Sequence, residues 1–538
     1  MKKRFLTLIL FLTYGFVFAQ NDSSPDKSKE YAATISAEDL KKHLTYIASD
    51  SLEGRDTGSE GQRKAATYIS NHFFQLGLQA IVPTETGGKG YYQFFNLYKK
   101  GWKDAYVRIG NKKKEFFKDY YPNGMTSIPE EEVMKVVFAG YGIESENYND
   151  YKNIDVKGKA IILFEGEPRD KGGVYRLAKT GEKSDWEEKT GLQKKITIAL
   201  NKGAKMFFVV PESDDSQFPS LAAERKAVLS RFNRLSFTQS AATEQASSSP
   251  TFYISRAMAA EMLGIKVRKL NKLMKRITKK GISTAGKVKE STISIKAERG
   301  EVPVETQNVL GFLEGTDKKD EVVLITAHYD HVGVQNGQVY NGADDDGSGT
   351  CAILEIAEAF AQAKRDGFGP RRSILFMTVT GEEKGLLGSQ YYADKNPIIP
   401  LDKTVCDLNI DMIGRIDKEH APREDYVYLI GADKLSSELH KISEETNNKY
   451  IKYQLDYTYN DPKDPNRFYY RSDHYNFAKH KIPVIFYFTG VHEDYHRPGD
   501  DVEKILFPKY QQIARLVFHT AWELVNREEK IKVDSNKP

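Results

Sequence analysis

The chain has 538 residues, of which 40% are hydrophobic and 29% are charged, and its formal net charge is +4. This length exceeds what one ordinary hydrophobic core accommodates, so two or three domains are expected. The nearly balanced charge, without a basic tract, gives no indication of nucleic-acid binding. Two cysteines in apolar segments argue against a disulfide-scaffolded fold.

The amino terminus is typical of a secretory signal peptide. Residues 2–4 are basic, residues 5–18 form an apolar run, and Val17 and Ala19 occupy the expected cleavage positions. We therefore predict that residues 1–19 are removed and that the protein is exported to the periplasm or out of the cell. No cysteine follows the run and no later run of about 20 apolar residues exists, so neither a lipoprotein anchor nor stable membrane insertion is expected.

The first half of the chain contains both predicted helices and predicted strands. Apolar residues at helical spacing predict two helices within 37–77, joined by the loop 54–61. Further along, the expected elements are strands at 133–143 and 157–168, a helix end with a turn and strand at 196–211, an exposed polar loop at 236–252, a short helix at 254–264 and a basic helix at 267–281. The basic helix has the composition of a solvated helix rather than of a binding site.

From about residue 305 the pattern becomes that of an α/β fold. The expected strands and helices are strands at 321–330, 371–383, 404–414 and 482–490, and helices at 349–364 and from 388 onward. Each strand segment is almost continuously apolar, as in strands buried on both faces. Helices between such strands indicate a doubly wound, largely parallel sheet.

Polar residues gather where these predicted strands end. The clusters are "AHYDH" at 327–331, "GEE" at 381–383, "NID" at 409–411 and "HEDYHRPGD" at 492–500. Ligand sites in open α/β sheets form outside the carboxyl ends of the strands. The four clusters are therefore expected to converge on one site.

The residue types in these clusters favour a divalent metal. The candidates are His328, Asp330, His331, Asp344, Asp345, Asp346, Glu382, Glu383, Asp411, His492 and His496. Imidazole and carboxylate without thiolate suit zinc or another borderline cation, whereas three contiguous aspartates do not fit the alternating ligands of an EF-hand loop. Of the adjacent Glu382 and Glu383, one can bind a metal while the other takes a proton from metal-bound water.

Six motifs in order resemble one family of enzymes. They are "AHYD", "GADDDGSG", "GEEKGLLGS", "NIDMIG", "SDHYNF" and "YHRPGD". With the amino-terminal "LEGRDTGSEG", they resemble the co-catalytic zinc aminopeptidases, whose wider family includes secreted bacterial leucine aminopeptidases, glutamate carboxypeptidase and glutaminyl cyclases. The resemblance covers residues 305–525 and implies a mostly parallel, mixed central sheet flanked by helices.

The resemblance also implies two zinc ions per chain, which would share one carboxylate. The ligands of the first ion would be His328, Asp345 and Asp411. Those of the second would be Asp345, Glu383 and His496, with His492 as the competitor of His496.

Four further aspartates would support the metal ligands. They are Asp330, Asp346, Asp473 and Asp500. Asp330 would accept the second ring N–H of His328 and fix its tautomer. The Asp345–Asp346 peptide bond would be cis, and a structural role is open for His331 and His492.

The function favoured by the resemblance is that of a secreted zinc aminopeptidase. A zinc-bridging water would attack the scissile carbonyl of a peptide, with Glu382 as the general base. The alternatives are a carboxypeptidase or dipeptidase acting on acidic peptides, a glutaminyl cyclase-like enzyme, and a receptor-like protein without catalysis. The carboxypeptidase would need a basic residue aimed at a substrate carboxylate, for which Arg415 and Arg471 are the candidates.

Residues 125–297 resemble a protease-associated insert, a β-rich domain beside the cleft. The predicted domains are a signal peptide at 1–19, the amino-terminal part of the peptidase domain at 20–124, the insert at 125–297 and the catalytic zinc-peptidase domain at 298–530. The insert is expected to limit access to the cleft or to help bind substrate.

Overall fold

The computed structural model describes residues 26–169, 174, 177, 186, 190–230, 234–238 and 249–536. The predicted signal peptide and residues 239–248 of the predicted polar loop lie outside these residues. Among the helices that are described, none combines the length and the apolar character needed to cross a bilayer.

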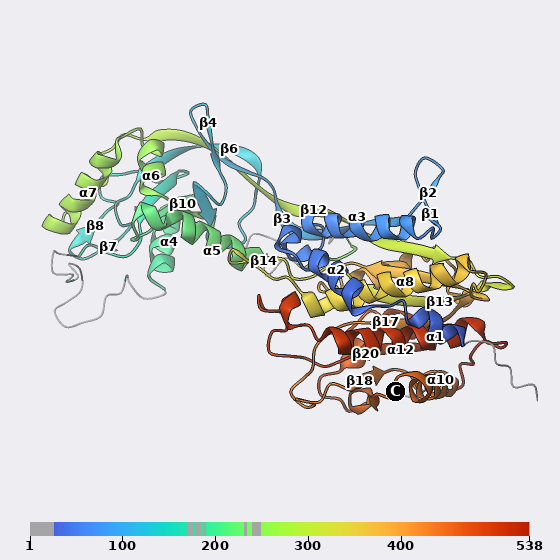
Figure 1. Ribbon diagram of the computed structural model, residues 1–538. Coiled ribbons are helices and arrows are strands. Elements are labelled where there is room, and N and C mark those ends of the chain that lie inside the picture. The colour runs from blue at the N-terminus through green and yellow to red at the C-terminus, as the bar shows by residue number, and fades with distance from the viewer. Residues whose placement is uncertain are drawn as a thin grey trace, which may run out of the picture.

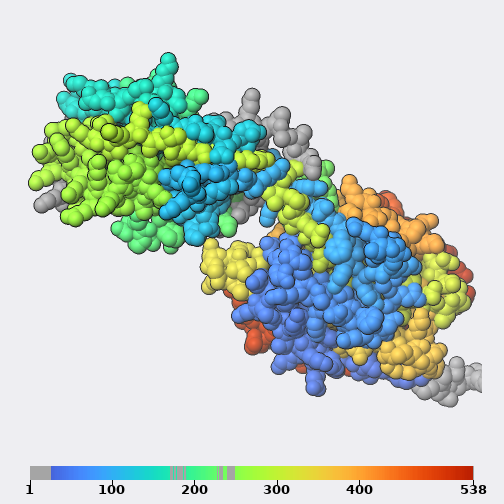
Figure 2. Space-filling view, turned by 90° about the horizontal axis from the view of Figure 1, so that it is seen from above, coloured from blue at the N-terminus to red at the C-terminus, as the bar shows by residue number. Residues whose placement is uncertain are grey.

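The described chain forms two lobes joined by a narrow connection (Figures 1 and 2). One 14-stranded sheet runs through both, in the order β19-β18-β20-β17-β13-β16-β12-β6-β9-β10-β11-β5. Off this path, β3 pairs with β12, and β4 pairs with β3. The connection is made by β3 (Tyr92–Ile109) and β12 (Ser291–Leu313), which pair antiparallel from Tyr92 opposite Val309 to Arg108 opposite Ser294. These two long strands were not predicted from the sequence.

The larger lobe contains the predicted α/β sheet. Its central neighbours are parallel: β20 (Val484–Phe488), β17 (Thr404–Ile410), β13 (Lys318–His328) and β16 (Arg372–Val379). Antiparallel strands flank them, β18 (Tyr426–Ile430) against β20 and β12 against β16, and β19 (Gln454–Asp456) lies at the edge. The predicted mixed, mostly parallel sheet is confirmed.

Helices cover both faces of this sheet, because alternate residues of its strands point to opposite sides. Val323 and Ile325 of β13 belong to one core, whereas Val322 and Leu324 belong to the other. The helices of the first face are α1 (Lys27–Ala32), α2 (Ala37–Ile47), α3 (Glu60–Gln75), α8 (Gly349–Arg365), α10 (Ser437–Tyr450) and α12 (Phe507–Asn526). The short helix α11 (Tyr475–Ala478) lies on the second face, and the short helix α9 (Leu387–Gln390) contacts it.

The smaller lobe is also α/β. Four of its strands are parallel neighbours: β6 (Ile128–Phe138), β9 (Ala160–Phe164), β10 (Met206–Val210) and β11 (Thr251–Ile254), and β5 (Tyr120–Pro122) is antiparallel to β11. Its helices are α4 (Gly191–Asn201), α5 (Phe218–Ser230), α6 (Arg256–Met262) and α7 (Val267–Lys280). Every residue of β9 and β10 is buried. The apolar runs that suggested a β-rich insert therefore belong to strands that helices cover.

The short elements complete the chain. They are β1 (Val82–Pro83), β2 (Lys89–Gly90), β4 (Lys112–Glu115), β7 (Glu144–Ser145), β8 (Tyr148–Asn149), β14 (Val334–Gln335), β15 (Gln338–Val339) and the helical turns η1 (Asp50–Arg55), η2 (Asp215–Gln217), η3 (Ala343–Ser348), η4 (Tyr391–Lys395), η5 (Leu401–Lys403), η6 (Thr458–Asn460), η7 (Phe468–Tyr470) and η8 (Val502–Lys504). Because β12 continues through residue 298, the predicted domain boundary there does not coincide with a strand end, and the domain division stays a prediction.

Candidate metal centre

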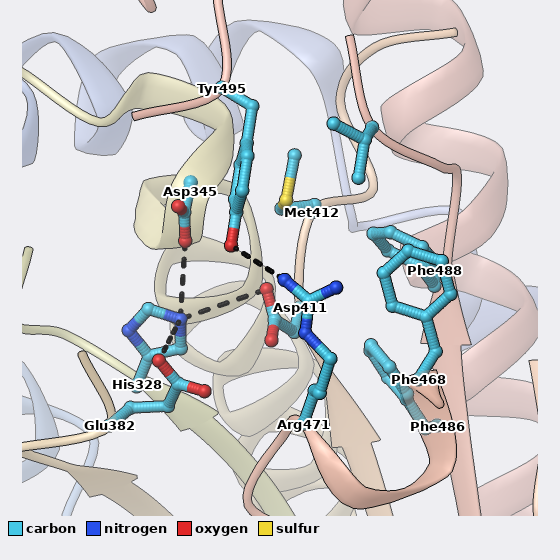
Figure 3. A pocket seen from close by; sticks show the side chains of 11 residues that line it. His328, Asp345, Glu382, Asp411, Met412, Phe468, Arg471, Phe486, Phe488 and Tyr495 are labelled. Carbon is cyan, nitrogen blue, oxygen red and sulfur yellow. Dashed lines mark hydrogen bonds and ion pairs between the residues drawn. The ribbon is translucent and has the colours of Figure 1, made fainter. Parts of the chain in front are cut away.

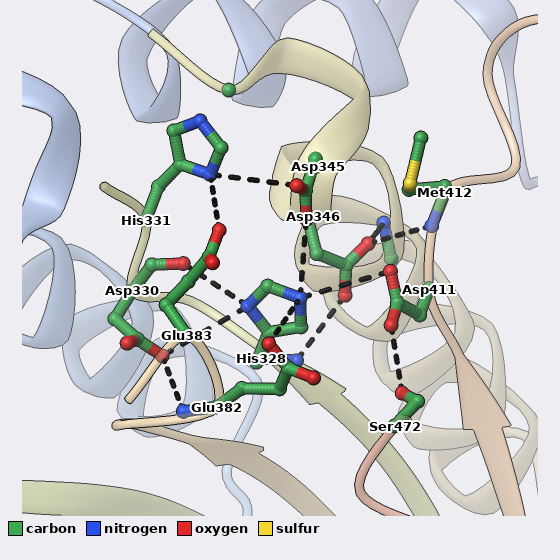
Figure 4. A network of polar contacts seen from close by, with 12 residues as sticks. His328, Asp330, His331, Asp345, Asp346, Glu382, Glu383, Asp411, Met412 and Ser472 are labelled. Carbon is green, nitrogen blue, oxygen red and sulfur yellow. Dashed lines mark hydrogen bonds and ion pairs between the residues drawn. The ribbon is translucent and has the colours of Figure 1, made fainter. Parts of the chain in front are cut away.

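The polar clusters predicted from the sequence meet at the carboxyl ends of the parallel strands (Figure 4). His328 is the last residue of β13, and Asp411 follows the last residue of β17. Glu382 and Glu383 lie in the turn after β16, and His496 lies in the loop after β20. Asp345 reaches the same place from η3, which precedes α8.

A first group of side chains surrounds the ring of His328. The Nε2 atom of His328 lies 3.3 Å from Oδ1 of Asp345, 3.7 Å from Oδ1 of Asp411 and 3.8 Å from Oε2 of Glu382. One ligand atom each from His328, Glu382 and Asp411 falls within 4.8 Å of the others. All four side chains are largely buried, since the most exposed of them, Glu382, exposes 12% of its surface.

A second group shares Asp345 with the first. The Nε2 atom of His496 lies 3.0 Å from both Oδ2 of Asp345 and Oε2 of Glu383. On the other side, Nδ1 of His331 lies 2.9 Å from Oε1 of Glu383 and 3.8 Å from Oδ2 of Asp345. Asp345 therefore touches both groups, one with each carboxylate oxygen.

The donor set fits a pair of divalent cations. Oδ2 of Asp345 and Oε1 of Glu383 are buried, and the groups that approach them in the described part of the chain are the rings of His331 and His496. Such atoms cost free energy unless a charge or donor satisfies them. Carboxylate oxygen and imidazole nitrogen without thiolate are a zinc-type donor set.

The pKa shifts of the histidines and glutamates also fit a site that binds cations. Burial alone would lower the pKa of His328 and of His496, but the facing carboxylates raise the pKa of His328 well above its usual value and that of His496 to about 10. Burial would raise the pKa of Glu383, yet hydrogen bonds from His331 and His496 hold it at about 2. Glu382 differs, because burial and the like charges of Asp411 and Glu383 raise its pKa well above the usual range. The cluster thus attracts positive charge, and burial favours the protonated form of Glu382.

The turn that carries Asp345 is held by two other aspartates. The carboxylate of Asp500 accepts hydrogen bonds from the backbone N–H groups of Asp344 and Asp345 at 3.0 Å. The carboxylate of Asp346 accepts hydrogen bonds from the backbone N–H groups of His328, Gly349 and Met412. The Asp345–Asp346 peptide bond is cis, which confirms that prediction.

Asp330 differs from its expected role. The Nδ1 atom of His328 lies 3.0 Å from the backbone oxygen of Asp330 and 3.9 Å from its carboxylate. The carboxylate instead accepts the hydroxyl of Thr57 at 2.8 Å and the backbone N–H of Glu382 at 3.2 Å. Because its oxygens are engaged there, Asp330 positions the turn of Glu382, and its backbone carbonyl orients the ring of His328.

The remaining predicted residues lie around this centre. Asp473 is fully buried and accepts the hydroxyl of Ser389, and burial raises its pKa to about 7. His492 lies 3.3 Å from Oδ2 of Asp344, so it belongs to the support of η3. His331, for which the sequence leaves a structural role open, lies against Glu383, and its adjacency to Asp330 in "HYDH" is the signal that places it at this strand end.

Residues 308–521 match the model of Peptidase family M28. The matched segment contains the strands and turns that carry both groups of side chains. The family resemblance indicated by the six motifs is therefore confirmed for these residues.

Similar proteins include aminopeptidases and zinc metalloproteases. Aminopeptidase YwaD of Bacillus subtilis is 29% identical over 251 residues, which are 45% of this chain and 50% of that protein. A probable zinc metalloprotease of Leptosphaeria maculans is 31% identical over 145 residues, 26% of this chain and 32% of that protein. The chain thus spans half or less of the length of these curated relatives. Among solved structures, BSAP, a zinc aminopeptidase from Bacillus subtilis, aligns with a TM-score of 0.47 and 19% identity over 93% of this chain and 98% of its own.

Proposed function

We propose that the protein is a zinc-dependent aminopeptidase that binds two zinc ions and releases residues from the amino ends of peptides. The observation that carries the proposal is the convergence of two imidazole and carboxylate groups on Asp345, with Glu382 beside them. The match to Peptidase family M28 and the relatives named as an aminopeptidase and a zinc metalloprotease support the reaction and the metal.

The proposed ligands follow from the distances. His328, Asp345 and Asp411 would hold the first ion. Asp345, Glu383 and His496 would hold the second. His496 is preferred to His331 because its Nε2 atom is equally close to both carboxylates, whereas Nδ1 of His331 is close only to Glu383. We assign to His331 an N–H donated to Glu383, which would orient that carboxylate.

Glu382 would act as the general base. Zinc, when bound at this site, supplies Lewis-acid polarisation of the scissile carbonyl and acidifies the attacking water. Glu382 would take the proton of that water and return it to the leaving amine. Its raised pKa suits a group that must carry a proton between these two steps. The contact between its backbone N–H and Asp330 would keep the side chain aimed at the cluster.

Metal analysis tests the ligand assignment. Purified, zinc-loaded protein is expected to contain two ions per chain by elemental mass spectrometry. The variant His496→Ala should contain about one, whereas His331→Gln should retain two. Two ions in His496→Ala together with one in His331→Gln would reverse the assignment, and fewer than one ion in the unaltered protein would contradict the proposal.

We also propose export and a role for the smaller lobe. The pattern of residues 1–19 supports a cleaved signal peptide, and the apparent mass of the mature protein would test this. The smaller lobe, taken as the protease-associated-like insert of residues 125–297, would restrict which peptides reach the centre. An unchanged peptide-length preference after deletion of this lobe would count against that role.

A further inference from the structure

A small pocket opens beside the carboxylate cluster (Figure 3). His328, Asp345, Glu382 and Asp411 form one side of it. The other side is formed by Met412, Phe468, Arg471, Phe486, Phe488, Val491 and Tyr495. The space at the centre of this pocket has a volume of about 30 Å³.

Arg471 is the one arginine or lysine that lines this pocket. Its guanidinium lies 3.4 Å from the hydroxyl of Tyr495 and 4.9 Å above the ring of Phe468. Figure 3 shows the guanidinium between the Asp411 side of the pocket and its phenylalanine wall. Among the described residues, Arg471 contacts Tyr495 and Phe468 and forms no ion pair with a carboxylate. Its charged donors are therefore held in place by an aromatic ring and a phenol but have no anionic partner.

The other arginine suggested by the sequence is already engaged. Arg415 lies 3.2 Å from carboxylate oxygens of both Glu493 and Asp494, and its side chain is 9% exposed. Lys384, which also follows the catalytic turn, lies 2.7 Å from Asp56. Arg471 alone of these three cations is oriented toward the place where substrate would sit.

We propose that Arg471, oriented by Tyr495 and Phe468, binds a carboxylate of the substrate and makes the enzyme selective for acidic peptides. The inference rests on the proposed peptidase function. A guanidinium binds a carboxylate through two parallel hydrogen bonds, and the aromatic wall would pack against the methylene groups of the same substrate residue. Two bound divalent cations would balance the negative charges of four carboxylates, those of Asp345, Glu382, Glu383 and Asp411. With both cations bound, the charge that remains for a substrate carboxylate to pair with in this pocket would be that of Arg471.

Arg471 could bind either the side-chain carboxylate of a substrate residue or the carboxylate at the end of the peptide. Pairs of substrates that differ in only one of these groups distinguish the two. Glutamyl, glutaminyl and leucyl p-nitroanilides differ in the side chain of the amino-terminal residue and lack a terminal carboxylate. Leucyl-glycine and leucyl-glycinamide differ only in the terminal carboxylate. The values of kcat/KM would be measured for the unaltered protein, Arg471→Gln, Arg471→Lys and the matched control Arg467→Gln, which changes an exposed arginine near the pocket that does not line it.

The expected result is a selective loss. Arg471→Gln should lower kcat/KM for the glutamyl substrate by about 10- to 100-fold and leave the glutaminyl and leucyl substrates within about twofold. A loss confined to leucyl-glycine would mean that Arg471 binds the terminal carboxylate of any peptide, and it would overturn the selectivity for acidic peptides. Arg471→Lys should recover part of the loss, and Arg467→Gln should change nothing. The proposal is overturned if the ratio of acidic to neutral substrate is the same in Arg471→Gln and in the unaltered protein.

A binding measurement separates this inference from the proposed function. Calorimetric titration of the zinc-loaded protein with L-glutamate and L-glutamine should show tighter binding of glutamate, and Arg471→Gln should abolish the difference. If no peptide is cleaved but this difference is found, the proposed function fails and the carboxylate site stands. If peptides are cleaved and glutamate binds equally to both proteins, the inference fails and the proposed function stands.

Discussion

The replacement Glu382→Gln tests the division of labour between two adjacent glutamates. Glutamine has nearly the same shape, so it can keep the backbone hydrogen bond to Asp330 at 3.2 Å and the position beside His328. It cannot accept and return a proton. General bases contribute about 10²- to 10⁴-fold to rate, which is about 3 to 5 kcal/mol of activation free energy. We expect kcat to fall by this factor and KM to change little.

The metal content decides whether the loss has the proposed cause. Glu382 lies close enough to His328 and Asp411 to be a ligand by distance alone. The account treats it as the base, so Glu382→Gln should keep two zinc ions per chain. The matched variant Glu383→Gln should lose zinc and activity together. Steady-state kinetics and elemental analysis of both variants are the assays. A kcat within about tenfold of the unaltered value, or loss of an ion in Glu382→Gln, would refute the reasoning.

Three further predictions concern stability. Asp500→Asn leaves one amide oxygen in place of the two carboxylate oxygens that accept the backbone N–H groups of Asp344 and Asp345. It should lower the free energy of unfolding by about 1 to 3 kcal/mol in urea titrations; no change would contradict the supporting role of Asp500. Chelation of the metal should lower Tm by a few degrees, and zinc but not magnesium should restore it; an unaltered Tm would count against bound zinc. Burial lowers the pKa of His519 from its usual 6.5 to about 4, so the unfolded chain binds more protons between these pH values. Stability should then fall by about 3 kcal/mol as pH falls through this window, and His519→Gln should remove that part of the pH dependence; equal slopes would refute it.

The sequence predicted the elements that are buried on both faces. The apolar runs of β13, β16, β17 and β20 were recognised because strands covered on two sides leave little room for polar residues. The long strands β3 and β12 were missed. Their exposed and buried residues alternate only in part, and charged residues interrupt both where they cross between the lobes. Their pairing is set by residues about 200 positions apart, which no local pattern reveals.

The site was predictable in its residue types and less so in its contacts. Every residue predicted as a metal ligand lies in the two groups, since strand ends and motif order constrain their positions. The partner of His328 was not predictable, because a backbone carbonyl and a carboxylate of the same Asp330 compete for one N–H. The orientation of Arg471 depends on Tyr495, which comes from a different loop.

The central claim is that this centre cleaves peptides from a free amino end. The most direct measurement compares hydrolysis of one peptide with that of the same peptide acetylated at its amino terminus, using zinc-loaded protein. We expect release of the first residue from the free peptide, at least about 100-fold slower cleavage after acetylation, and cleavage by Glu382→Gln that is slower by about 10²- to 10⁴-fold. Equal cleavage of both peptides, or release of the carboxyl-terminal residue, would contradict it.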